Sequence, residues 1–146
     1  MGRLLDRLRG RRTQDAVSYD DDDSLQLLIT ADEAARADSA VLAEAERRGV
    51  SLAAPLLVRH HLLLPGPAEV ERAAVLLGQD GYRLTVTDGQ PCRVRAYRTQ
   101  LLTALSAAQE RSRMAGLAQR LGGDVTGWDA LGPAPAGGGG DAARRS

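Results

Sequence analysis

Strict alternation of apolar and polar residues predicts two β-strands in the second half of the chain. Residues 82–87 read YRLTVT and residues 92–97 read CRVRAY, and the turn sequence DGQP joins them. Alternation of this length is typical of strands with one buried face, and a short link containing glycine is typical of a β-hairpin. A further strand is predicted for 56–65, LLVRHHLLLP, because this run is short, rich in branched residues and ended by a proline.

Apolar positions at helical spacing predict three helices. The first extends from an N-cap at Asp38 to Gly49, the second lies within 67–82 and starts with a proline, and the third runs from a cap at Thr99 to about Leu121. Two glycines follow the third helix, as is common where helices end.

Two other segments have less distinct patterns. Residues 25–29 form either an isolated apolar turn or a short strand, and DVTGW at 124–128 predicts a short final strand. The predicted order is therefore helix, strand, helix, strand, strand, helix, strand. A hairpin placed between helices predicts an α+β fold of the ferredoxin-like type, with an antiparallel sheet and helices packed on one face.

The two ends of the chain differ from this central pattern. Residues 1–23 combine a basic amphipathic piece with YDDDD, whose adjacent carboxylates repel one another, and we predict a flexible segment there. Residues 132–146 are rich in Gly and Pro and are predicted to be disordered, which leaves one α+β domain at 24–131. The basic piece at 1–12 is either a solvated terminus, which we favour, or a weak anchor to a membrane or an acidic partner.

Composition narrows the functional classes. The 146 residues carry 19 basic and 19 acidic side chains, so net charge gives no general attraction to nucleic acid. The single cysteine excludes an internal disulfide. No apolar run approaches the roughly 20 residues that a membrane span needs, and the N-terminus lacks the features of a signal peptide. We therefore expect a cytoplasmic protein without stable membrane insertion.

The alternating strands also predict a locally basic surface. If helices cover one side of the sheet, period-two alternation places a set of arginines, one histidine and one tyrosine on the open side. This surface would suit an acidic protein partner or RNA phosphates, or it would only keep the sheet soluble. The stacking aromatics that RNA-recognition sheets use are almost missing, so RNA binding is the alternative. The open-side residues are Arg59, His61, Arg83, Arg93, Arg95 and Tyr97.

No pattern in the chain predicts catalysis. His60 and His61 are adjacent in a strand and point to opposite faces, so they cannot both bind one metal ion. A Ser/His/Asp arrangement has no candidates, and the glycines cluster in the tail instead of forming a phosphate-binding loop between a strand and a helix. We therefore predict no catalytic residues, no metal and no cofactor.

Several motifs, in this order, resemble one known family. They are a strand with His60 and His61, a helix leading into Gly81 and Tyr82, a hairpin, a long helix and the closing sequence GGDVTGW. Over about 38–131 the chain resembles the regulator of ribonuclease E activity B (RraB-like) family. The resemblance implies a ferredoxin-like α+β fold and a protein without enzymatic activity that binds and inhibits ribonuclease E, thereby modulating RNA decay.

The only tryptophan, Trp128, stands at the end of the predicted final strand. Gly127 before it would allow a close approach or an unusual φ, and the indole would close a core that has no phenylalanine. The other interpretation is a hot spot on the partner surface. Because a half-buried ring can do both, Trp128 joins the open-side residues as a partner-binding candidate.

Overall fold

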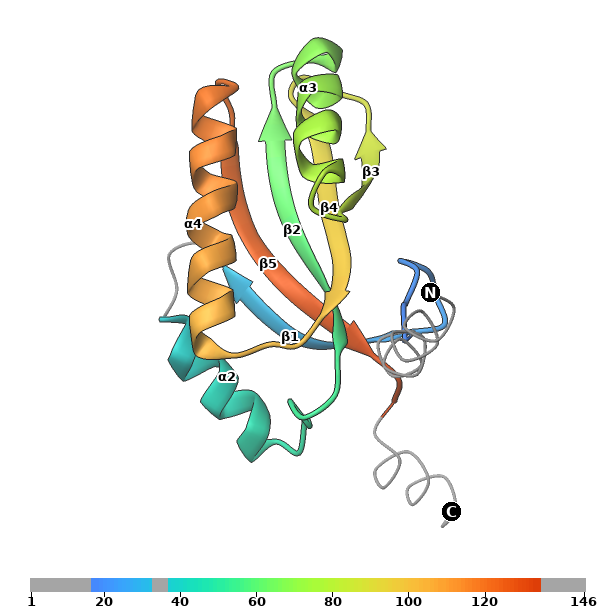
Figure 1. The fold of residues 1–146 in the computed structure, drawn as a ribbon, viewed down its shortest axis with the longest axis vertical. Helices are drawn as coiled ribbons and strands as arrows, with labels where there is room; N and C mark the ends of the chain where they lie inside the picture. Colours follow the sequence, from blue (N-terminus) through green and yellow to red (C-terminus); the bar gives the residue numbers. More distant parts are fainter. Residues whose placement is uncertain (1–16, 33–36, 135–146) are drawn as a thin grey trace, which may run out of the picture.

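The computed structural model describes residues 17–32 and 37–134 (Figure 1). These residues form a five-stranded antiparallel sheet and three helices, which makes the fold α+β. The strands are β1 (Gln26–Asp32), β2 (Leu56–Leu64), β3 (Arg83–Thr87), β4 (Cys92–Gln100) and β5 (Asp124–Gly132). The helices are α2 (Asp38–Arg47), α3 (Pro67–Gly78) and α4 (Ala104–Arg120). Among the described residues, no helix is long and apolar enough to cross a membrane.

The strands lie in the order β1-β5-β2-β4-β3, and every neighbouring pair is antiparallel. Figure 1 shows the three helices on the same side of this sheet, and none of the helices in 17–32 and 37–134 covers its other face. In β2, residues from Val58 to Leu64 alternate between buried and half-buried, as a strand with one covered face requires. The alternation used to assign sides in β2 and β4 is confirmed by these burial patterns.

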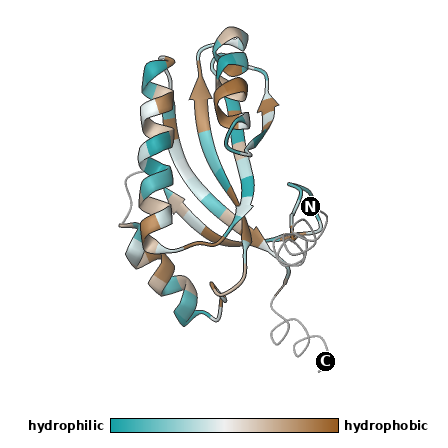
Figure 2. Cartoon of the chain, viewed as in Figure 1, coloured by the Kyte–Doolittle hydropathy of each residue, from teal (hydrophilic) through white to brown (hydrophobic). Residues whose placement is uncertain are grey.

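The core between helices and sheet has two apolar clusters. One lies under α2 and contains Trp128, and the other lies under α3 and the second half of α4 and contains Met114. Both ends of β2 are hydrophobic and its middle is hydrophilic, whereas much of α4 is hydrophilic (Figure 2). The polar middle of β2 consists of Arg59, His60 and His61.

Residues 25–29, whose pattern left a turn or a strand open, belong mostly to a strand. β1 runs from Gln26 to Asp32 and pairs with β5 at the edge of the sheet. The element order therefore begins with a strand, which the sequence prediction did not include.

The predicted start of the long helix at Thr99 is wrong. β4 continues to Gln100 because it pairs along the whole of β2, with Leu56 opposite Gln100. The cap is Thr103, whose side chain accepts a hydrogen bond from the backbone N–H of Ser106 while the Ser106 hydroxyl accepts one from the backbone of Thr103. This reciprocal pair is a capping box, and the helix begins where it can form.

Asp38 is not the N-cap of α2 either. Ala37 occupies the cap position without a side-chain hydrogen bond, and Asp38 is the first helical residue, 7% exposed. Its carboxylate faces the core, where it meets partners from α4 and β5. An Asp that caps a helix and an Asp that is its first residue give the same local sequence pattern, so the pattern alone does not distinguish them.

Candidate functional site

The open face of the sheet brings together six of the seven candidate residues. Arg59 and His61 come from β2, Arg93, Arg95 and Tyr97 from β4, and Arg83 from β3. Strand register sets Arg59 opposite Tyr97 and His61 opposite Arg95, while Arg83 pairs with Tyr97 from the other side. The Arg83 guanidinium also lies 5.3 Å from the centre of the Tyr97 ring, a cation–π distance. We call this set of six residues the arginine face.

Asp129 of β5 lies at the edge of the arginine face, opposite Arg59 of β2. Arg59 makes a two-pronged contact with it, with Nε 2.7 Å from Oδ1 and Nη2 2.8 Å from Oδ2. His61 Nε2 lies 2.9 Å from the same Oδ2. Burial by itself raises the pKa of Asp129, but the hydrogen bonds from Arg59 and His61 outweigh it and hold that pKa below its usual value. The paired carboxylate in turn raises the pKa of Arg59.

Sequence reasoning missed Asp129, although a signal for it exists. It directly follows Trp128, so alternation places its side chain on the face opposite the indole, next to Arg59 in the β2–β5 register. The predicted final strand ended at residue 128, so Asp129 was not considered as a neighbour of Arg59. β5 in fact extends to Gly132.

Two residues of the acidic run also lie on the arginine face. Asp21 is 4% exposed in its side chain, with Oδ1 2.8 Å from Arg59 Nη1 and Oδ2 3.0 Å from Arg95 Nη2. Asp20 pairs with Arg83. The backbone N–H of Tyr19 donates to Oγ1 of Thr99 in β4 at 2.8 Å. These contacts differ from the solvated linker that four adjacent carboxylates predict; residues 1–16 of the same segment lie outside the described part of the chain.

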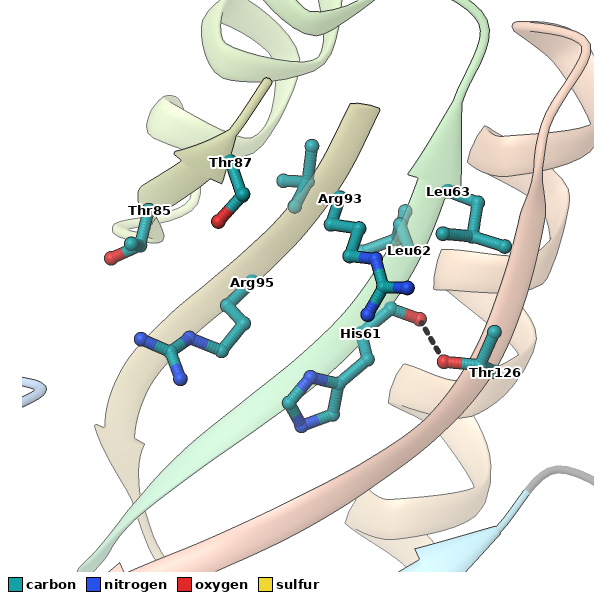
Figure 3. Close-up of a pocket in the computed structure, with 9 residues that line it drawn as sticks. His61, Leu62, Leu63, Thr85, Thr87, Arg93, Arg95 and Thr126 are labelled. Atoms are coloured by element: carbon teal, nitrogen blue, oxygen red, sulfur yellow. Dashed lines mark hydrogen bonds between the residues drawn. The ribbon is translucent and has the colours of Figure 1, made fainter. Parts of the chain in front are cut away.

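Beside this acidic cover the arginine face is hollowed. A depression of about 470 Å³ is bounded by His61, Arg93, Arg95 and three threonines, Thr85, Thr87 and Thr126. Figure 3 shows the Arg93 guanidinium extending from β4 toward His61 and the Arg95 guanidinium extending away from it, with the Thr126 hydroxyl donating to the backbone carbonyl of His61. Arg93 forms no ion pair within the described part of the chain, so its charge is available to a ligand. Guanidinium forks and hydroxyls together suit carboxylate or phosphate oxygens.

Trp128 lies away from the arginine face. It pairs with His60 on the helix-covered side and is 2% exposed. Its Nε1 donates to Asp38 Oδ1 at 3.1 Å, and Arg111 of α4 donates to the same oxygen at 2.6 Å. The Arg111 hydrogen bond, helped by that of Trp128, lowers the pKa of Asp38 against the opposing effect of burial. The indole therefore links β5 to α2 and α4, the structural role foreseen for it.

The described residues include no group of three or more His, Cys, Asp or Glu side chains arranged to hold a metal ion. His60 is buried on the helix side, opposite His61, and burial lowers the pKa of His60 to about 4. Cys92 is buried. The arrangement on the open face can thus bind anionic groups, and the chemistry it offers is ion pairing and hydrogen bonding.

Comparison with known proteins adds one match. A family model described as regulator of ribonuclease activity B (RraB) matches residues 35–130. No curated protein and no solved structure matches. The matched range includes the whole arginine face and Asp129, and it excludes Asp20, Asp21 and β1.

Proposed function

The chain belongs to the regulator of ribonuclease activity B family, and on that premise we propose that it inhibits a ribonuclease E-type enzyme by binding it through the arginine face. Family membership makes it a regulator of ribonuclease activity and implies a ribonuclease partner. The inhibition, the particular enzyme and the surface are the proposal. It acts as a binding protein without catalysis of its own, in the cytoplasm, where RNA decay takes place.

The observation that carries the proposal is the concentration of four arginines on the helix-free face of a chain with zero net charge. Guanidiniums on neighbouring strands repel one another unless carboxylates or other anions lie among them, so this face favours anionic partners. Asp129 relieves part of this repulsion and fixes the Arg59 fork in place. A guanidinium held in this way loses little freedom when its remaining Nη1, which contacts Asp21 in the structure, binds a carboxylate or a phosphate.

A charge-reversal experiment tests the surface. Replacing Arg93 and Arg95 with Glu should weaken binding to the ribonuclease by at least about tenfold and reduce its inhibition, because the contacts would become repulsive. The melting temperature should change little, since both side chains lie outside the two apolar clusters and the one ion pair lost among the described residues, between Arg95 and Asp21, holds a segment that also lies outside them. Replacing Arg72 and Arg120 of α3 and α4 with Glu is the matched control, with the same charge change on the helix side. Equal affinity in both double variants would refute this surface.

Direct RNA binding through the same face is the second candidate, supported by the free guanidinium of Arg93 and the threonine hydroxyls of the depression. The two functions separate in a pull-down from lysate with and without ribonuclease treatment. A ribonuclease E-type enzyme recovered after RNA is destroyed supports direct protein binding. Recovery only while RNA survives supports RNA binding.

We also infer a ferredoxin-like arrangement for β2 to β5. Its support is the strand order β5-β2-β4-β3 with all pairs antiparallel, and the placement of α3 between β2 and β3 and of α4 between β4 and β5. β1 is then an addition at the edge of that unit beside β5.

A further inference from the structure

The acidic run folds back over the arginine face, and this contact indicates what the face binds. We propose that Tyr19–Asp21 is an internal competitor, seated in a site for an acidic peptide segment of the partner protein, and that it must leave before that segment binds. The proposal rests on the proposed function, in that it takes the arginine face as the partner surface. It adds the chemistry of the partner and the regulation of the site.

The seated segment shows the recognition in detail. Asp21 lies between Arg59 of β2 and Arg95 of β4, and Asp20 reaches Arg83 of β3. Two successive carboxylates thus form ion pairs with arginines from three adjacent strands. A short acidic peptide lying across the sheet would bind in the same way. The backbone hydrogen bond from Tyr19 to Thr99 adds a contact that any peptide could make.

The segment is held in a way that allows it to leave. Neither apolar cluster contains a residue of it, so its release uncovers no core. The pair between Asp20 and Arg83 is exposed on both sides, at 69% and 57% of the side-chain surface. When Asp21 leaves, Arg59 keeps its two-pronged contact with Asp129, and the half-exposed Arg95 can be hydrated. The site therefore stays formed without its internal occupant.

Charge favours exchange for an acidic partner. With the segment in place, Asp20, Asp21 and Asp129 offset three of the four arginine charges of the face. Release of the segment leaves Asp129 as the carboxylate among these pairs, so the net charge of the four arginines and their carboxylates rises from +1 to +3. Because the segment is tethered directly to β1, its effective concentration is high, and a partner must supply more contacts than two carboxylates to displace it.

The next two carboxylates of the run, Asp22 and Asp23, do not contact the arginines of the face in the described part of the chain. Asp22 accepts hydrogen bonds from the backbone N–H and hydroxyl of Ser24, at 2.8 and 2.6 Å, and so closes the turn that leads into β1. Asp23 makes no contact with the arginine face in the described structure. Removing the charges of Asp22 and Asp23 therefore changes net charge as much as removing those of Asp20 and Asp21, without touching the face.

The test uses the full chain in three forms: the unmodified protein, Asp20→Asn with Asp21→Asn, and the control Asp22→Asn with Asp23→Asn. The probe is a fluorescent peptide with the sequence VSYDDDDSL, alongside a version in which every Asp is Asn. We expect the acidic peptide to bind the first double variant about five- to tenfold more tightly than the other two proteins, since the ion pairs of Asp20 and Asp21 with Arg59, Arg83 and Arg95 no longer compete. The Asn peptide should bind none of them.

Equal peptide affinity for all three proteins would overturn the inference. So would a double variant, Asp20→Asn with Asp21→Asn, that binds a single-stranded RNA oligonucleotide more tightly but the peptide no more tightly than the unmodified protein does. If Asn at position 21 impairs folding, Asp20→Asn alone decides the matter, because that residue is exposed. Ribonuclease binding is measured with the same variants. If the double variant binds the peptide more tightly and no form of the protein binds the ribonuclease, the acidic-peptide site is supported and the ribonuclease is refuted as its partner. The two proposals therefore fail separately.

Discussion

At the scale of single residues, polar groups between the helices and the sheet link elements that are far apart in the chain. Asp38, Arg111 and Trp128 form a buried cluster that joins α2, α4 and β5. His60 lies beside them, 2% exposed, with an unpartnered Nε2 and its ring edge-to-face with Tyr82. A neutral imidazole tolerates this position better than a charged one, because burial and the charges of His61, Arg98 and Arg111 outweigh the opposing effect of Asp129.

His60 should therefore make folding sensitive to mild acid. Its pKa in the native protein is about 4, below the ordinary 6.5, so between these values the unfolded chain binds a proton that the native one does not. Stability should fall as pH drops from 6.5 to 4, by up to roughly 3 kcal/mol. Denaturant unfolding of His60→Gln should show a much weaker dependence in this window. Asp38 and Asp129, whose pKa values are lowered, lose their stabilising effect only below about pH 4.

The matched control for this prediction is His61→Gln, which changes the neighbouring histidine on the open face and leaves His60 in place. It should keep most of the loss of stability, because burial, the main cause of the lowered pKa of His60, is unchanged, and only the smaller effect of His61 is removed. An identical pH dependence in both variants would show that His60 is not the group responsible. That the two histidines face opposite ways was predictable from strand period alone, whereas the partners of Asp38 were not, because Arg111 and Trp128 are 73 and 90 residues away.

At the scale of elements, β5 depends on a close approach to β1. Gly127 has φ of 146°, and a Cβ atom there would lie 2.4 Å from the backbone oxygen of Ala31. The close approach and unusual φ foreseen for Gly127 are confirmed. Because the neighbour is backbone in a paired strand, it cannot move aside without breaking the ladder between β1 and β5.

Gly127→Ala should consequently lower the free energy of unfolding by about 2 kcal/mol or more, through strained φ and steric overlap. Gly116→Ala in the middle of α4 is the opposite case, since its nearest neighbour would be 4.0 Å away, and it should stabilise by up to about 1 kcal/mol. Chemical denaturation measures both. Equal effects of the two substitutions would mean that the close approach in β5 is relaxed in solution.

Element boundaries show where local patterns stop being informative. Thr99 and Thr103 both precede a helical pattern, and only the length of the β2–β4 ladder decides that Thr103 is the cap. The edge strand β1 was equally ambiguous, because its pattern of apolar residues is interpretable only once β5 lies beside it. The arginine face was predictable because it follows from alternation within β2 and β4.

At the scale of the whole molecule, the acidic cover could not be foreseen from the sequence. Four adjacent carboxylates are ordinarily solvated, and the arginines that bind Asp21 are 38 and 74 residues away in the chain. Net charge was equally uninformative, because a total of zero describes both a dispersed mixture and two opposite patches in contact. The tertiary fold creates the basic patch, and only then does the acidic run acquire a partner.

This internal pairing should alter how salt affects binding to the ribonuclease. Added salt weakens the partner's ion pairs with the arginine face, but it weakens those of Asp20 and Asp21 too, so in the unmodified protein the two effects partly cancel. In the variant Asp20→Asn with Asp21→Asn no such compensation exists, and its affinity should fall more steeply between about 50 and 300 mM salt. The two proteins should approach the same affinity at the upper end of that range. Titration calorimetry at several salt concentrations measures both slopes, with Asp22→Asn/Asp23→Asn expected to follow the unmodified protein. Parallel slopes would mean that the segment and the partner do not compete for the same arginines.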